Sequence, residues 1–496
     1  MSEQHSSLQQ IIDARIEKLQ TLRDSGVNPY PHTYLPTHYS QNILESYDAL
    51  EGKTVRIAGR IMSLRKMGKA SFCHVQDTKG RIQSYVRKDD IGEDTYAHFK
   101  LLDIGDFIGI EGYVFKTKTD EISIHATSIS VLAKSIRPLP IVKEKDGETF
   151  DAFSDKELRY RNRHLDLIVN PDVRQTFVDR AKIIAHLRHF LDDNGYLEVE
   201  TPVLQPLYGG ANARPFETYY KSLEQTFYLR IADELYLKRL IIGGFDKVYE
   251  ISKDFRNEGI DRNHNPEFTM LEFYEAYGDV FSMMELVENM IRSTAQYLSK
   301  LQVHWGDMDI DISKPFAKKP ILELLQEATG QDVTNASEDD LVALCKKHQL
   351  AIPDQMNYGR LLDELMRRLV EPNLIQPTFV IDYPKEISPL AKAHRNGDNG
   401  LVERFELFIG GAEFANAFSE LNDPIDQRER FQNQERLMAD GEDEAHPVDE
   451  HFLQAMECGM PPTGGVGIGV DRLVMLLTEN RWIKDVILFP ALRSVD

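Results

Sequence analysis

The sequence has few cysteines. Its 496 residues include three, Cys73, Cys345 and Cys458, which lie far apart and show no paired spacing. Disulfide frameworks and zinc sites draw on cysteines in pairs, so this spacing argues against both kinds of site. It favours a reducing compartment, and we expect the cytoplasm.

Long hydrophobic runs are also missing. No apolar stretch approaches the roughly 20 residues that a membrane-spanning helix needs, and the first ten residues, MSEQHSSLQQ, are polar. We therefore expect neither a signal peptide nor a membrane partner. Hydrophobic residues make up 42% and charged residues 28% of the chain, as in ordinary globular proteins. The length predicts two or three domains.

Positive charge is scarce overall but concentrated in one segment. The formal net charge is −22, which at first sight disfavours nucleic acid as a partner. The segment from Lys53 to Lys88, however, contains ten basic residues and a single acidic one, Asp77. A local basic patch can bind phosphates on an otherwise acidic protein.

The first third of the chain predicts a helix followed by a β-barrel. Apolar residues recur at helical intervals from Leu8 to Leu22, so residues 1–50 are expected to form a helical extension. Five short alternating segments follow within residues 51–140, with a longer insert near 90–103, as in a five-stranded OB barrel. Phe72 alternates with Cys73 and Val75, which favours a surface position where it could stack on a base; a core position is the alternative.

The remaining chain predicts alternating helices and strands. We expect a linker over 141–170, a long helix over 172–194 and a strand over 196–201 that stops at Pro202. A glycine-led loop, GGANARPF, occupies 209–216, and a further helix starts near Glu234. Residues 281–400 are largely polar and are expected to form a helical insertion.

Residues 249–277, YEISKDFRNEGIDRNHNPEFTMLEFYEAY, predict two strands joined by a long polar loop. Side chains alternate along a strand, so Glu272 and Tyr274 share a face with Phe268. A buried carboxylate is costly without a partner, so a cation is expected beside Glu272. That cation could be a ligand, or a lysine or arginine of the chain in a structural salt bridge.

Residues 405–421 predict an acidic hairpin with a turn at Gly410 and Gly411. Phe408 should pair with Glu413, which places Glu406 and Glu413 diagonally on one face and suits a shared divalent cation such as Mg²⁺. Three residues further along the strand have the opposite parity to Glu413: Asn416, Phe418 and Glu420. A bulge near 414–415 would turn both sets to one pocket; otherwise one set points outward.

Glycines alternate in the last predicted strand, at Gly465, Gly467 and Gly469, and Arg472 follows closely. A strand face without side chains lets a flat ring approach the backbone. The spacing differs from that of a dinucleotide-binding loop.

Together these strings resemble class II aminoacyl-tRNA synthetases, in the form carried by bacterial-type lysyl-tRNA synthetases. Residues 255–269, FRNEGIDRNHNPEFT, resemble motif 2, the helix and strand near 172–201 resemble motif 1, and the glycine strand with Arg472 resembles motif 3. The resemblance covers nearly the whole chain. It implies an α+β protein, with an N-terminal five-stranded OB barrel that binds the anticodon and a catalytic domain at 171–496 with an antiparallel sheet flanked by helices.

The resemblance also implies roles for residues and partners: lysine–tRNA ligase activity with ATP, L-lysine and tRNA(Lys), Mg²⁺ as cofactor, and a homodimer formed through the motif 1 region. The implied catalytic residues are Arg256 and Arg472. ATP would be bound by these two and by Glu258, His264, Asn265, Phe268, Glu406 and Glu413, the last two also holding the metal. Lysine would be bound by Gly210, Glu234, Arg256, Glu272, Tyr274, Asn416, Phe418 and Glu420, and the anticodon by Arg65, Phe72, Gln83 and Glu121.

The sequence leaves three alternatives open. A synthetase for aspartate or asparagine shares the architecture, but an acidic substrate needs a cation where this chain has Glu272 and Glu420. A non-catalytic tRNA-binding relative would be expected to lose Arg256, Arg472 or the two metal-site glutamates. A ligase that attaches lysine to a protein would lack the OB domain.

Overall fold

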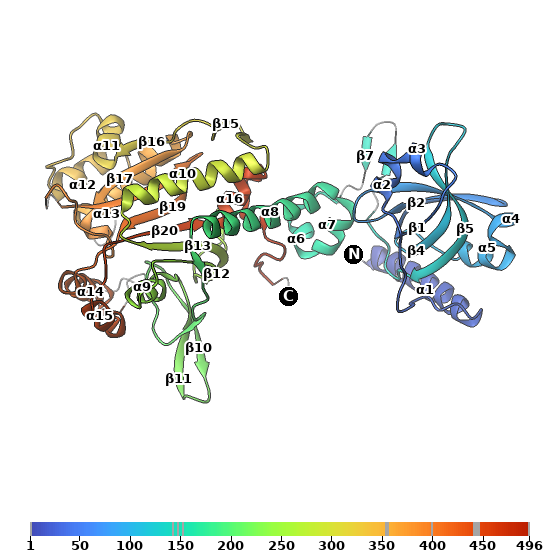
Figure 1. Cartoon of the computed structure of the whole chain (residues 1–496), viewed down its shortest axis with the longest axis horizontal. Coiled ribbons are helices and arrows are strands. Elements are labelled where there is room, and N and C mark those ends of the chain that lie inside the picture. Colours follow the sequence, from blue (N-terminus) through green and yellow to red (C-terminus); the bar gives the residue numbers. More distant parts are fainter. Residues whose placement is uncertain are drawn as a thin grey trace. The chain divides into compact units, whose positions relative to one another are not determined.

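The computed structural model describes residues 2–140, 143–145, 148–150, 153–352, 357–397, 400–439 and 447–494. The chain divides into two compact units, Met1–Phe153 and Ser154–Asp496, which are treated separately below (Figure 1). Within the described residues, no helix combines the length and the apolar character needed to cross a membrane.

The first unit is built on a closed five-stranded barrel. Its strands follow the order β1-β2-β3-β5-β4 and have the bounds β1 Thr54–Met67, β2 Ala70–Gln76, β3 Arg81–Arg87, β4 Phe107–Lys116 and β5 Ile122–Ala133. Buried and more exposed residues alternate along β2 and β3, so one face of each strand fills the barrel. Two short helices occupy the predicted insert, α4 (Lys88–Ile91) and α5 (Glu93–Lys100). The predicted OB fold is confirmed.

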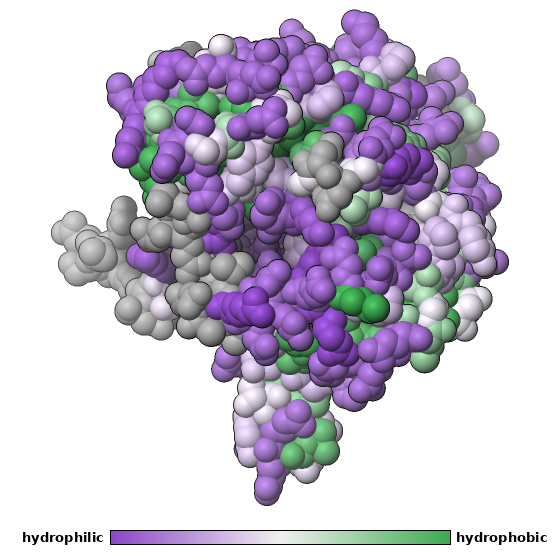
Figure 2. All heavy atoms as spheres, turned by 90° about the vertical axis from the view of Figure 1, so that its left-hand side faces the viewer, coloured by the Kyte–Doolittle hydropathy of each residue, from purple (hydrophilic) through white to green (hydrophobic). Residues whose placement is uncertain are grey.

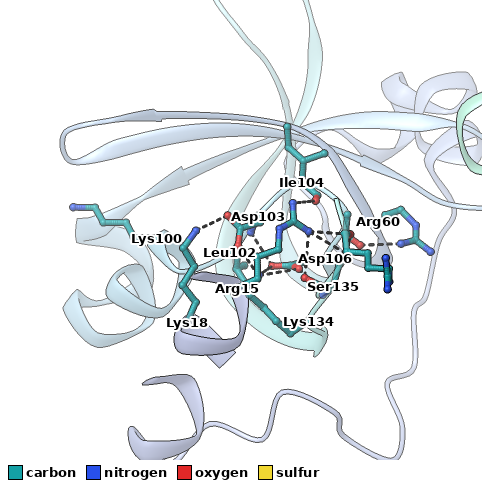
Figure 3. A network of polar contacts seen from close by, with 12 residues as sticks. Arg15, Lys18, Arg60, Lys100, Leu102, Asp103, Ile104, Asp106, Lys134 and Ser135 are labelled. Carbon is teal, nitrogen blue, oxygen red and sulfur yellow. Dashed lines mark hydrogen bonds and ion pairs between the residues drawn. The ribbon is translucent and has the colours of Figure 1, made fainter. Parts of the chain in front are cut away.

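Helix α1 (Ser2–Asp24) is fastened to this barrel by a polar network (Figure 3). Arg15 donates hydrogen bonds to backbone carbonyls of the barrel unit, and Lys18 pairs with Asp103 at 2.6 Å. The buried ammonium of Lys134 lies 2.6 Å from Asp103 and 2.9 Å from Asp106. The buried ammonium thus meets opposite charges and the Arg15 guanidinium meets carbonyl oxygens, which compensates desolvation and holds the helix in a defined place. Helices α2 (Ser40–Glu45) and α3 (Tyr47–Leu50) lead into β1.

The second unit is organised by an eight-stranded sheet of order β16-β17-β18-β19-β20-β13-β12-β8. Its strands are β8 Leu197–Glu198, β12 Lys247–Phe255, β13 Glu267–Ala276, β16 Ala317–Pro320, β17 Thr378–Pro384, β18 Leu401–Ile409, β19 Ala412–Ser419 and β20 Thr463–Gly469. The neighbours pair antiparallel except at the two ends, β16 with β17 and β12 with β8. This confirms the predicted sheet flanked by helices.

Helices cover one face of this sheet and bury the main core. They are α8 (Pro171–Asp193), α10 (Val280–Tyr297) and α16 (Val470–Leu477), and α10 runs along the sheet in Figure 1. Leu187, Val287 and Leu473 meet strand residues such as Phe273 and Phe405 in one cluster. The alternate strand residues therefore point to the opposite face, where the candidate site lies.

The segment 281–400 differs from the expected helical insertion. It does contain α11 (Ile321–Thr329), α12 (Glu338–Lys347) and α13 (Tyr358–Leu365). It also contains a small hairpin, β14 (Gln302–Trp305) and β15 (Met308–Asp311), and two strands of the main sheet, β16 and β17. Buried Phe379 and Val380 of β17 belong to the cores on the two sheet faces, which is why this strand is part of the sheet.

Residues expected to be linker also carry structure. A short hairpin, β6 (Lys143–Lys145) with β7 (Glu148–Phe150), precedes helices α6 (Lys156–Arg161) and α7 (Arg163–Val169). Buried Arg163 pairs with Asp166 at 2.6 Å and donates to the Leu488 carbonyl at 2.9 Å, which holds α7 against the C-terminal part of the same unit. Strand β8 is shorter than the predicted 196–201, since the Thr201 amide donates to the side chain of Glu250 on β12 instead of to a backbone carbonyl of that strand.

Candidate active site

The site is centred on the hairpin of β12 and β13, which pair antiparallel with Ile251 opposite Leu271. A cavity of about 360 Å³ opens on this sheet face. In Figure 2 the second unit has a hollow whose rim is mostly hydrophilic. The cavity is lined by nearly all the catalytic-domain residues singled out from the sequence: Gly210, Glu234, Arg256, Glu258, His264, Asn265, Phe268, Glu272, Tyr274, Glu413, Asn416, Phe418, Glu420 and Arg472. Glu406 does not line it.

Glu272 forms the acidic floor of the cavity. It is 6% exposed, accepts a hydrogen bond from the Tyr274 hydroxyl at 3.0 Å and forms no ion pair with any described residue. Carboxylate oxygens of Asp233 and Asp254 lie within 4.8 Å of its own. Burial and these two carboxyl groups raise the pKa of Glu272 well above its usual range. The structural salt bridge considered for Glu272 is therefore absent from the described part of the chain.

Arg230 compensates part of this acidic group. It lies 3.0 Å from Asp233 and 3.4 Å from Asp254, and both carboxyl groups are fully buried. Burial raises the pKa of Asp254 to about 6. One guanidinium among several buried carboxyls leaves a negative surplus next to Glu272, so an incoming cation is favoured there.

Lys238 is a residue that sequence reasoning missed. It lies on α9 (Glu234–Ile242), its ammonium is buried, and it forms ion pairs with both Glu234 and Glu420. Burial raises the pKa of Glu420 to about 8, while the nearby Lys238 opposes that rise. The spacing of four between Glu234 and Lys238 on a predicted helix was the signal that could have revealed this pair.

The other end of the cavity carries aromatic and cationic groups. The Arg256 guanidinium lies 5.1 Å from the centre of the Phe268 ring. Arg472 lies 3.1 Å from Nε2 of His264 and 3.3 Å from the Glu413 carboxylate. A flat base could stack between such groups, and the guanidinium groups suit phosphate.

Asn265 adds a polar group to this end of the cavity. Its side-chain nitrogen donates to the Glu267 carbonyl at 2.6 Å. Its side-chain oxygen is buried and has no hydrogen-bond partner among the described residues. A buried acceptor without a partner is costly, so this oxygen is suited to receive a donor from a ligand.

The acidic hairpin has the predicted register. Phe408 pairs with Glu413 and Leu407 with Ala415, so the bulge falls at Phe414 as expected, and Glu413 and Asn416 both reach the cavity. Glu406 lies outside the cavity lining, where it contacts Arg404 and accepts from the Tyr383 hydroxyl at 2.9 Å.

Two carboxyl groups near this hairpin have raised pKa values. Burial, with Glu413 nearby, raises the pKa of Glu406 to about 7. Burial and the charges of Glu406, Asp363 and Glu413 raise the pKa of Glu371 to about 8. Burial is the largest cause of both pKa shifts, and the neighbouring carboxyl groups add to it. Hard carboxylate oxygens are the ligands that Mg²⁺ prefers.

Two glycines are required by their surroundings. A side chain at Gly465 of β20 would clash with Glu420 and with the Tyr274 ring. Gly210 has φ +89°, and its Cβ would lie 3.2 Å from Glu234 and from Ala232. Both positions keep the backbone close to the acidic end of the cavity.

The barrel carries a second group of candidate residues. The Gln83 side chain donates to Glu121 at 2.6 Å, and His74 lies 3.1 Å from the same carboxylate. Phe72 is half-buried on the outer face of β2, with Arg65 opposite it on β1. The predicted surface position of Phe72 is thus confirmed, and the four predicted anticodon residues lie on neighbouring elements of one unit.

Comparison with known proteins defines the class. Residues 155–493 match the family of class II tRNA synthetases for D, K and N, and residues 55–132 match the OB-fold nucleic acid binding domain. The chain belongs to the class II tRNA synthetases of this group. It is 50% identical over 496 residues to a lysine–tRNA ligase of Carboxydothermus hydrogenoformans, an alignment that covers 99% of this chain and 100% of that protein.

Proposed function

We propose that this protein is a lysine–tRNA ligase, which activates L-lysine with ATP to lysyl-adenylate and pyrophosphate and then transfers lysine to the 3′ end of tRNA(Lys). The observation that carries the proposal is the buried carboxylate of Glu272, which has Tyr274 and other acids around it and no ion pair among the described residues. An ammonium group is the substrate feature that fits such a place. The 50% identity to a lysine–tRNA ligase supports it.

Lysine would lie along the acidic floor of the cavity. In this proposal Glu272, Tyr274 and Glu420 bind the ε-ammonium group. Glu234 and Gly210 bind the α-amino group, Asn416 and Arg256 bind the carboxylate, and Phe418 lines the side-chain path. Lys238 already neutralises part of the charge of Glu234 and Glu420, which leaves Glu272 as the carboxylate with the strongest need for a cation.

ATP would occupy the opposite end. Arg256 would contact the α-phosphate, Phe268 and Arg472 would enclose the adenine, and Glu258, His264 and Asn265 would position the nucleotide. The lysine carboxylate attacks the α-phosphorus and pyrophosphate leaves, so no protein nucleophile is needed. Arg256 and Arg472 are the proposed catalytic residues because they orient the reactants and offset developing charge.

We propose Mg²⁺ as the cofactor, held by Glu406 and Glu413. When bound, it would neutralise negative charge on the phosphates of ATP. In the structure Arg404 and Arg472 lie against these two carboxylates, so metal binding would compete with two existing ion pairs.

The remaining partners follow from other surfaces. We propose that Arg65, Phe72, Gln83 and Glu121 bind the anticodon, and that the protein is a homodimer formed through the motif 1 region. Exposed Leu197 on β8, the end strand of the described sheet, supports the dimer, since an exposed apolar group on an open strand edge invites association. The cytoplasm stays the proposed compartment.

The alternatives are less well supported. An aspartate synthetase would need a free cation near Glu272, but the neighbouring side chains are acidic and Lys238 is already paired. The neutral side chain of asparagine would leave these acidic groups without a cation. The arginines and carboxylates that a non-catalytic relative would lose are present. A ligase for protein substrates would lack the OB unit, which matches a nucleic-acid-binding family here. Amino-acid-dependent ATP–pyrophosphate exchange tests the proposal directly.

A further inference from the structure

The barrel carries a row of aromatic side chains that crosses its strands in register. Phe72 on β2 is paired with Tyr85 on β3, Tyr85 with His125 on β5, and His125 with Tyr113 on β4. Arg65 on β1 is paired with Phe72, so the row involves every strand of the barrel. Paired residues point to the same face of a sheet, which places the five side chains side by side.

The rings form a continuous surface. Their centroids are 4.9 Å apart between Phe72 and Tyr85, 5.0 Å between Tyr85 and His125, and 4.6 Å between His125 and Tyr113. The Tyr113 ring is stacked nearly parallel on His125, at 19°, and Tyr113 is 36% exposed. One side of Tyr113 is therefore covered by a ring, and the residue is open to solvent.

The side chains of this row are not part of the hydrophobic core of the barrel. The barrel interior is filled by the alternate residues of the same strands, such as Cys73, Val86, Ile124 and Val114, which are fully buried. Aromatic rings that stay partly exposed on the outer face of a barrel are suited to contact a partner with flat groups.

Positive charge lies at the Arg65 end of the row. Arg65 and Lys69 are exposed at the β1–β2 turn, and neither forms an ion pair within the described part of the barrel. A strip of rings beside free cations combines base stacking with phosphate attraction, the combination used to bind single-stranded nucleic acid. A protein partner would not need the cations.

We infer that the row extends the RNA-binding surface beyond Phe72, and that Tyr113 stacks on a second unpaired base of the anticodon loop. The occupant is the tRNA loop itself, with Phe72 and Tyr113 holding different bases and Tyr85 and His125 filling the space between them. This inference rests on the proposed function, because it takes the tRNA as the partner of the barrel.

The test uses the full-length protein and a synthetic anticodon stem-loop of tRNA(Lys). Tyr113→Ala should weaken binding of the stem-loop about tenfold, the loss of one stacked base. Tyr113→Phe should bind like the unaltered protein, because it keeps the ring. Tyr39→Ala is the matched control: Tyr39 is 44% exposed on the same unit but lies outside the row, and its loss should change nothing.

A second arm identifies the stacked base. Stem-loops with a single abasic position are scanned around the loop. One position should weaken binding to the unaltered protein and have no further effect on Tyr113→Ala, since both changes remove the same contact. Normal binding by Tyr113→Ala, an equal loss in Tyr113→Phe, or full additivity at every loop position would overturn the inference.

Failure of this inference is distinguishable from failure of the proposed function. Lysine-dependent pyrophosphate exchange needs no tRNA, so it reports on the catalytic site alone. A protein that exchanges with lysine but shows no Tyr113 effect keeps the function and loses the second stacking contact.

Discussion

At the scale of single residues, the buried carboxylates of the site differ in whether a cation of the chain already neutralises them. We expect this difference to determine the amino-acid specificity of the site. Lys238 is shared by Glu234 and Glu420, and Arg230 serves Asp233 and Asp254. Among the described residues, Glu272 has only a phenol and a backbone amide at 3.4 Å as hydrogen-bond donors. Sequence parity predicted which face Glu272 occupies, but it could not show that Lys238 also pairs with Glu420 and Arg230 with Asp254, because these two pairs join elements that are distant in the chain.

Glu272→Gln should weaken lysine binding far more than ATP binding. The change removes the charge that meets a desolvated ammonium, a loss of about 2–5 kcal/mol by analogy with buried interfacial pairs. Separate KM values for lysine and ATP in pyrophosphate exchange measure it. Glu275→Gln is a matched control on the same strand, since Glu275 pairs with Lys247 at 2.9 Å on the other face. Equal losses for lysine and ATP would refute the assignment.

Lysine binding should tighten as the pH rises from about 6 to about 8. Burial raises the pKa of Asp254 to about 6 and that of Glu420 to about 8, and the pKa of Glu272 is raised as well. A raised pKa keeps a larger share of these carboxyl groups protonated at the lower end of this pH range, and an ammonium favours their ionised forms. Binding should therefore release protons, and each step up in pH removes part of that cost.

Calorimetry of lysine binding in two buffers of different ionisation enthalpy counts the released protons. The Glu272→Gln protein should release fewer protons than the unaltered protein when it binds lysine. Affinity that is constant or falls over this pH range would show that the carboxyl groups are already ionised without lysine.

At the scale of elements, the strand alternation gave much of the site in advance. The pairing of Phe408 with Glu413 and the bulge at Phe414 follow from the Gly-Gly turn and the parity of Asn416, and both are present. Strand β17 was not predicted, because the strands with which it pairs are distant in the chain. Its short apolar run also lies within the largely polar and helical segment 281–400. Arg404, two residues from Glu406 on the same strand face, was likewise overlooked.

Glu413→Gln tests whether the acidic hairpin serves a metal or the fold. If Glu413 helps hold Mg²⁺, adenylate formation should fall steeply, lysine binding should persist, and added Mg²⁺ should recover part of the rate. The melting temperature without ligands should hardly change, because Glu413 is 40% exposed in its side chain and its pair with Arg472 is weak.

Glu403→Gln is the matched control on β18. Glu403 is buried and pairs with Arg395, so its neutralisation should lower the melting temperature with no rescue by Mg²⁺. A Glu413→Gln protein that behaves like this control would end the metal-site interpretation.

At the scale of the whole molecule, the chain consists of two compact units. The barrel unit and the catalytic unit each have a separate core, so a change on the barrel surface need not reach the adenylate site. The barrel could be predicted from the spacing of its strands, and the fold of the second unit from the resemblance of its motifs to those of class II synthetases. The helices α6 and α7 could not, because the charged, proline-bounded sequence before them resembles a linker.

Phe72→Ala should slow aminoacylation of tRNA while adenylate formation continues. Loss of a stacked base weakens tRNA binding by about 1–3 kcal/mol. Val75→Ala is the contrasting variant on the same strand, since Val75 is buried and its truncation should lower barrel stability. Thermal melting and both activity assays are compared. A parallel fall in pyrophosphate exchange and melting temperature for Phe72→Ala would place its effect in folding instead of RNA binding.

The central claim is that the acidic cavity around Glu272 selects lysine for activation. ATP–pyrophosphate exchange measured with each of the twenty amino acids in turn tests this most directly, because it needs neither tRNA nor the barrel. The account predicts strong exchange with lysine and little with the others, aspartate and asparagine included, and loss of the lysine signal in Glu272→Gln. Exchange driven best by an acidic or neutral amino acid would contradict it.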